Sequence, residues 1–97
     1  MEVGQVYTFK LNSGEEVIAK VVANNGSTVD VETPVSVAPG PQGMGLIQSL
    51  FTADPDEKIT LNMNCVAIHA LTDDSVKMKY IEATTGIKVP DKKIIMG

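Results

Sequence analysis

The chain has 97 residues, of which 43% are hydrophobic and 4% aromatic, and its formal net charge at pH 7 is −4. This length fits one domain, and the apolar content argues against intrinsic disorder. The negative charge and the absence of Arg disfavour general nucleic-acid binding, because affinity for a phosphate backbone comes mostly from Lys and Arg. We therefore do not expect DNA as a partner.

The first part of the chain predicts three antiparallel strands. Ser13-Gly14 and Asn25-Gly26 are typical of tight turns, and apolar residues alternate on either side of them. Pro34 cannot donate to a strand ladder, so the third strand should bend or end near it. The predicted strands are residues 3–11, 16–22 and 28–37, a bent meander of the kind that begins a small barrel.

A long loop is predicted next, over residues 38–58. It begins with the breaker-rich run Pro39–Gly45 and ends with the acidic run Asp54–Lys58. An elongated hairpin arm and a brief helical turn both fit this length. The apolar residues between the two runs predict a partner-contact surface, formed by Met44, Leu46, Ile47, Leu50 and Phe51.

Two further strands are expected, on either side of a bulge or tight turn at residues 62–65, where the apolar alternation changes phase. Cys65 ends the first alternating run, so we predict a buried free thiol there. Thr72-Asp-Asp-Ser75 is typical of a helix start, and we expect one helix at about residues 73–85, followed by a loosely held tail at 87–97. The fold class is therefore mainly β, with five strands and a C-terminal helix.

Catalytic and cofactor signals are weak. The single His69 has no recognisable nucleophile partner, so a structural or surface role is favoured over catalysis. The acids Asp54, Asp56 and Glu57 fit a turn better than a cation loop, and Pro39–Gly45 lacks the Lys-Ser/Thr ending of a phosphate-binding loop. We expect no enzyme activity, cofactor or metal. With no signal peptide or membrane-spanning run recognised, a cytoplasmic protein is the default expectation.

The order of these features resembles the Sm-like (LSm) family over residues 3–37 and, more loosely, 58–71. Gly14 matches the family's turn glycine, and Ala19 occupies the position of the small residue at which the second strand bends. The matching apolar positions are Val17, Val21, Val29 and Val31. The chain is also similar to short Sm-like proteins encoded by tailed phages.

The resemblance implies a single five-stranded Sm-like/SH3-like barrel over about residues 3–71, assembled as a homo-oligomeric ring. In such rings, strand four of one subunit pairs with strand five of the next. The corresponding interface residues here are Ile59, Leu61, Met63, Val66 and Ile68.

The resemblance also implies RNA contacts in two loops, at Asn24, Asn25, Asn62 and Asn64. The chain departs from the family here, because Asn62-Met-Asn64 stands where an Arg-Gly pair is usual, and the helix is C-terminal rather than N-terminal. Two functions follow as alternatives. The first is an RNA-associated ring, and the second is an oligomeric structural or protein-interaction module without nucleic-acid binding.

Overall fold

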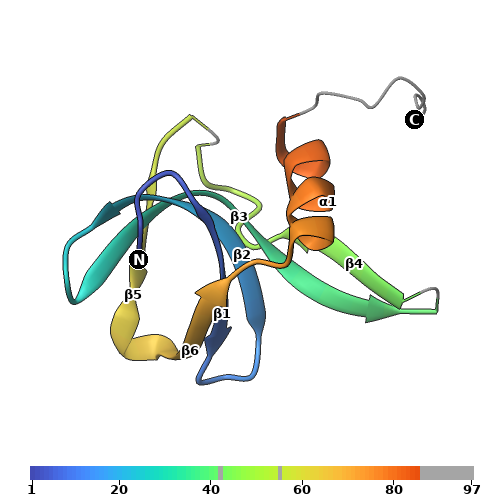
Figure 1. The fold of residues 1–97 in the computed structure, drawn as a ribbon, viewed down its shortest axis with the longest axis horizontal. Coiled ribbons are helices and arrows are strands. Elements are labelled where there is room, and N and C mark those ends of the chain that lie inside the picture. The colour runs from blue at the N-terminus through green and yellow to red at the C-terminus, as the bar shows by residue number, and fades with distance from the viewer. Residues whose placement is uncertain (42, 55, 86–97) are drawn as a thin grey trace.

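The computed structural model describes residues 1–41, 43–54 and 56–85 as an antiparallel sheet with one helix (Figure 1). The predicted tail at 87–97 lies outside these residues. The elements, in chain order, are β1 (Val6–Leu11), β2 (Glu16–Asn24), β3 (Thr28–Gly40), β4 (Gly43–Gln48), β5 (Ile59–Asn62), the 3-10 turn η1 (Met63–Cys65), β6 (Val66–Leu71) and α1 (Asp74–Thr85).

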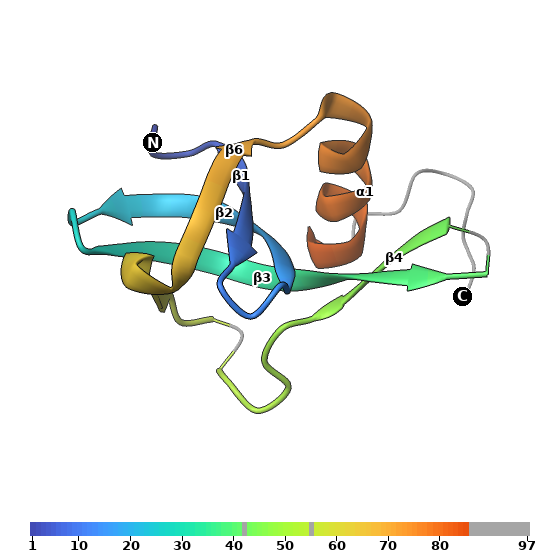
Figure 2. The same cartoon turned by 90° about the horizontal axis from the view of Figure 1, so that it is seen from below.

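The sheet has the order β4-β3-β2-β1-β6, and β5 pairs with β3 beside this path. The long strand β3 therefore belongs to two pairings: its first half pairs with β5 (Val31↔Ile59) and its second half with β4 (Val37↔Leu46). Figures 1 and 2 show the consequence, a strongly curved sheet at one end and a two-stranded β3–β4 arm that extends away from it.

Alternating apolar residues form the main core on the concave side of the curved sheet. Phe9, Ala19 and Val21 are completely buried there. β1 and β2 face each other in a regular register, with Phe9 opposite Val17, and Gly14 has the positive φ (95°) that the turn between them requires. The full buried cluster is Tyr7, Phe9, Ala19, Val21, Val29 and Val31.

A second cluster lies under α1. Val6, Ile18 and Val35 come from three different strands, and Tyr80 of the helix is buried against them. Asp73 precedes the first residue of the helix and caps it: its Oδ2 accepts the backbone N–H of Ser75 at 3.1 Å. Capping by a short acidic side chain at this position satisfies helix donors that otherwise lack partners.

β3 changes direction at a bulge between the two clusters. Ile18 pairs with Val35 but Lys20 pairs with Glu32, so two steps along β2 match three along β3. Thr33, within this bulge, has φ 44°. The strand therefore bends at Thr33–Pro34 rather than ending there, and this bend directs the arm past α1 (Figure 2).

Several predictions are confirmed. The fold is mainly β with one C-terminal helix, the three-stranded meander is present, and a tight turn separates β5 from β6. For residues 38–58 both a hairpin arm and a brief helical turn were considered. The structure shows a hairpin arm there, formed by β3 and β4.

Others need correction. The described residues form six strands rather than the predicted five, because β4 forms where a long loop was predicted. Cys65 is exposed rather than buried, because η1 breaks the alternation that was extended to it. The sheet is open, so the closed barrel is not confirmed by the described residues. Across those residues, no helix is both long and apolar enough to cross a bilayer.

Candidate functional site

In the described part of the chain, β5 and β6 each have an edge without a partner. β5 pairs with β3, β6 pairs with β1, and the short turn η1 joins β5 to β6 without pairing them. Each strand therefore presents a row of backbone N–H and C=O groups that another strand can engage. These two edges are the candidate assembly surfaces.

The predicted interface residues occupy two different environments. Four of them, Ile59, Leu61, Met63 and Val66, are half-buried and pack against the main core. Ile68 is 65% exposed, and so is the unpredicted Leu71, at 62%. Since successive strand residues point to opposite faces, these two residues show that both faces of β6 lack cover.

His69 lies on β6 opposite Phe9 on β1. Its ring centroid is 6.4 Å from that of Tyr7, with the rings nearly perpendicular, and 6.5 Å from that of Phe9. These contacts lie within the range of aromatic packing. The imidazole therefore packs beside the aromatic end of the core while His69 stays exposed, an arrangement that accords with the structural or surface role favoured from the sequence.

The two asparagine-bearing turns lie side by side at one end of the sheet (Figure 1). Thr28 is paired with Asn62, and the backbone N–H of Met63 donates to the carbonyl of Ser27 at 3.0 Å. The structure thus brings together the β2–β3 turn and η1. The predicted RNA contacts Asn24, Asn25, Asn62 and Asn64 are all exposed there.

Some of the asparagine side-chain amides in these turns already make hydrogen bonds within the turns. Asn24 Oδ1 accepts the N–H of Gly26 at 3.1 Å, and Asn62 Oδ1 accepts that of Asn64 at 2.9 Å. These bonds hold the turns and orient the amides. The Nδ2 groups of both capping asparagines remain as potential donors toward solvent.

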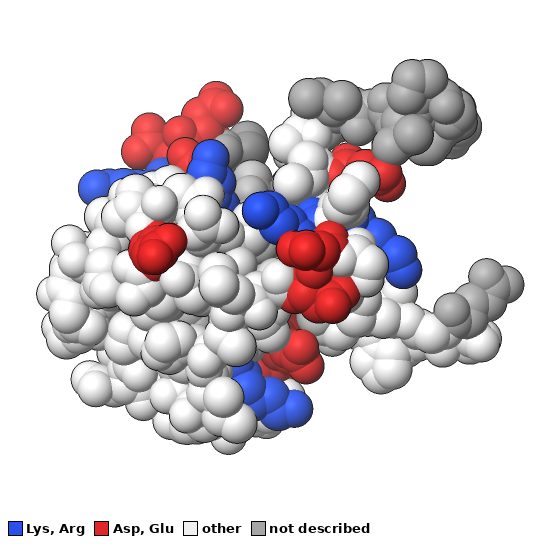
Figure 3. All heavy atoms as spheres, in the orientation of Figure 1, with Lys and Arg blue, Asp and Glu red and all other residues white. Residues whose placement is uncertain are grey.

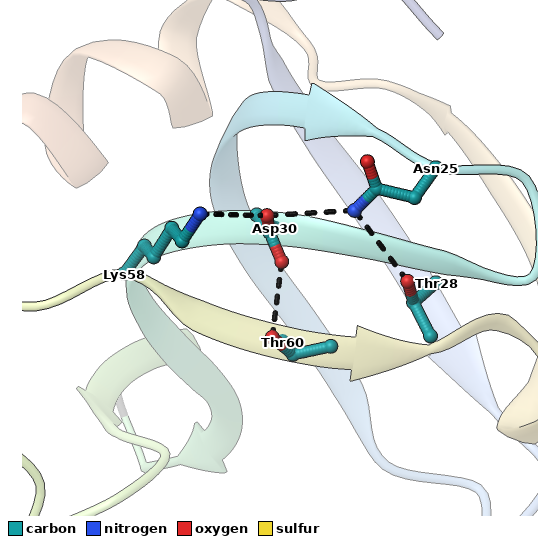
Figure 4. A network of polar contacts seen from close by, with 5 residues as sticks. All are labelled: Asn25, Thr28, Asp30, Lys58 and Thr60. Carbon is teal, nitrogen blue, oxygen red and sulfur yellow. Dashed lines mark hydrogen bonds and ion pairs between the residues drawn. The ribbon is translucent and has the colours of Figure 1, made fainter.

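Asp30 on β3 organises the polar network beneath the turns (Figure 4). Its carboxylate accepts from Thr60 Oγ1 at 3.0 Å and from Asn25 Nδ2 at 3.4 Å, and it lies 3.3 Å from Lys58 Nζ. The hydrogen bond from Thr60 lowers the pKa of Asp30 below its usual value; partial burial opposes this shift, and Lys58 and Asn25 reinforce it. Asp30 therefore stays charged near neutral pH and links the β2–β3 turn to β5.

The predicted partner-contact residues lie on the arm and just beyond it. Phe51 is 75% exposed, and Met44, Ile47 and Leu50 are also exposed. Leu46 differs because it packs beside Val37 against the cluster under α1. The arm therefore has an anchored face and a large uncovered apolar remainder.

A cavity of about 180 Å³ opens at the base of the arm. Val35 and Ile59 contribute apolar lining, and Asp54 and Glu57 add carboxylates at its edge. Asp54 Oδ1 accepts the N–H of Asp56 at 2.9 Å, so these acids form a turn. Among the residues that the structure describes, no group of three His, Cys, Asp or Glu side chains is placed to hold a metal ion.

Comparison with models of known protein families finds none that matches this chain, and comparison with curated proteins finds no matching relative. The resemblance to Sm-like proteins therefore stays a prediction from the residues quoted above.

Proposed function

We propose that this chain is the subunit of a closed homo-oligomeric ring with an Sm-like small barrel, in which β5 of one copy pairs with β6 of the next. The observation that carries the proposal is the pair of unpartnered edges on either side of η1, within residues 59–71. The exposed Ile68 and Leu71 on opposite faces of β6 support it, because both would gain cover from a neighbouring subunit.

The contact is heterologous, since it joins two different edges. Such contacts close into a ring when the rotation between copies permits it. In the ring, the open sheet of each subunit is completed by its neighbour's strand. The half-buried residues of β5, among them Ile59 and Leu61, would then extend the core up to the subunit boundary.

The asparagine turns are the proposed RNA-contacting face of this ring. They adjoin each other, and their exposed amides offer both donors and acceptors to the edges of unstacked bases. With no Arg in the chain, binding should be weak and depend little on salt. We assign no catalytic step to the ring.

A second candidate is an oligomeric structural or protein-interaction module without nucleic-acid binding. The arm favours it, because Phe51 and its apolar neighbours are exposed on a projecting element. The internal hydrogen bonds of Asn24, Asn25 and Asn62 also favour it, because they reduce the amide groups available to RNA.

Native mass spectrometry at low micromolar concentration tests the assembly. We expect a closed ring for the unmodified chain and its loss in Ile68→Lys, because a lysine on β6 opposes strand addition. Met78→Lys is the matched control: it makes the same change of charge at a residue of similar exposure on α1. A monomeric or dimeric unmodified chain would refute the ring.

The two candidates separate in a titration with oligouridine and oligoadenosine at low salt. Saturable binding that weakens in Asn64→Ala would support the RNA-associated ring. No saturable binding by a folded ring would leave the structural module.

A further inference from the structure

The β3–β4 arm carries a third unpartnered strand edge, which the proposed ring does not use. β4 pairs with β3 from Gly43 to Gln48, and no other strand among the described residues pairs with it. The pairing of β3 with β2 ends at Ser36, so the outer part of the arm is a ribbon of two strands (Figure 2). Isolated two-stranded ribbons are marginally stable in water.

This arm contains no charged residue. Residues 33–53 include no Asp, Glu, Lys, Arg or His, although charged residues make up 21% of the chain. In Figure 3 the arm, at the lower right, shows neither acidic nor basic groups on its visible described part. Two copies that each carry a net charge of −4 can meet here without bringing like charges together.

The two edges of the ribbon differ in how they are protected. β3 contains Pro39, which lacks a backbone N–H and interrupts any further ladder. β4 (GMGLIQ) contains no proline and no charge, the residues that usually block strand addition. The unprotected edge is therefore that of β4.

We propose that β4 pairs antiparallel with β4 of a second copy across a two-fold axis, giving a continuous four-stranded sheet from two arms. Pairing of identical edges is self-complementary, so one two-fold axis gives each β4 edge the other as its hydrogen-bonding partner. A two-fold axis at Gly45 would place Met44 of each copy opposite Leu46 of the other, on the face that continues from the cluster under α1. This would cover Met44, which is 39% exposed in the single chain.

Gly45 provides the test. A Cβ at this position would meet its nearest neighbour, the carbonyl oxygen of Ala38, at 3.5 Å, an ordinary contact, and the backbone has no positive φ there. Gly45→Lys is thus compatible with the single chain and would place two lysines together at the two-fold axis. Gly45→Ala is the control without charge.

The proposal does not depend on the ring, and native mass spectrometry separates the two. We expect the unmodified particle to have twice the mass of the Gly45→Lys particle and the same mass as Gly45→Ala. Ile68→Lys should leave a dimer, and the double variant Gly45→Lys/Ile68→Lys a monomer. Circular dichroism checks that each variant is folded, and Met44→Lys replaces Gly45→Lys if the latter is not.

An unchanged particle mass in folded Gly45→Lys or Met44→Lys would overturn the pairing of arms, whether or not a ring forms. In that case we would expect the uncovered apolar surface of the arm to bind a different protein. Conversely, an Ile68→Lys dimer that Gly45→Lys dissociates would support the arm pairing even if no ring is found.

Discussion

The hydroxyl of Tyr80 lies 2.8 Å from Oγ1 of Thr33, the one non-glycine residue with a positive φ within residues 1–41, 43–54 and 56–85. The same hydroxyl donates to the carbonyl of Glu32 at 2.9 Å and accepts the N–H of Lys20 at 3.1 Å. Because a phenol has one proton, Thr33 is then the donor in their mutual bond. A single side chain on α1 thus satisfies the backbone groups that the bulge in β3 leaves without ladder partners.

Tyr80→Phe should destabilise the fold by about 1–3 kcal/mol, because it leaves partly buried backbone groups of Lys20 and Glu32 without this partner. Urea denaturation measures this as a lower midpoint with an unchanged slope. Tyr7→Phe is the control, since the Tyr7 hydroxyl serves only the N–H of Glu2 near the chain terminus. Equal losses in the two variants would contradict the role assigned to Tyr80.

Burial of Tyr80 raises its pKa above the ordinary 10.0, although the hydrogen bond from Thr33 opposes the shift. The folded chain therefore retains this proton at a pH where the unfolded chain loses it. Stability from this source is complete below pH 10.0 and falls as the pH rises further. We expect Tyr80→Phe to show a flatter decline between pH 10 and 11 than the unmodified chain, measured by urea midpoints. Parallel declines would rule out this linkage.

Asp30 predicts an acid dependence of opposite sign. Its pKa is lowered from 3.8 in the folded chain, chiefly by the hydrogen bond from Thr60, so the contribution of its charge is complete well above pH 3.8 and is lost as the pH falls through the folded value. Asp30→Asn should lower stability at pH 7 and reduce the acid-induced loss below pH 4. Asp56→Asn makes the same change of charge in the exposed 54–57 turn and is the control. A similar reduction of the acid-induced loss of stability in both variants would exclude a specific role of Asp30.

Packing in the cluster under α1 predicts that shortening a buried side chain lowers stability. Ile18 is 1% exposed between β3 and α1, so Ile18→Val should cost about 0.5–1.5 kcal/mol through the removed methylene and the space that it leaves. Ile81→Val makes the same change on the exposed side of α1 and should be nearly neutral. Thermal or urea unfolding compares the two, and a larger effect at Ile81 would reverse the assignment of the buried face.

The sequence predicts best where local signals and tertiary packing agree. Alternation and glycine turns give the β1–β2–β3 meander, and Asp73 marks the start of α1 within one residue. β4 was not among the five predicted strands, and the region was left open between a hairpin arm and a helical turn. Gly43 and Gly45 have low strand preference, and the strand form of β4 comes from its pairing with β3.

The candidate site was predictable in part. The proximity of the two asparagine turns follows from the β3–β5 pairing, which the sequence alone does not specify. Cys65 was wrongly predicted to be buried, because it lies in the 3-10 turn η1. The alternation of apolar residues does not predict such a turn. Leu71 was not singled out, since exposure on both faces of β6 depends on the lack of a neighbour in space.

The placement of β6 beside β1 also bears on how fast the chain folds. Thr8 and Thr72, whose hydroxyls lie 2.9 Å apart, are separated by 64 positions in the sequence. The β1–β2, β2–β3 and β3–β4 hairpins, by contrast, join segments that are close along the chain. Because closing a long loop costs entropy before its contacts form, we expect β6 to dock after the hairpins. During that interval Tyr7 and Phe9 lack the cover that β6 provides, so the rate of this last step governs how long the aromatic end of the core stays open to solvent.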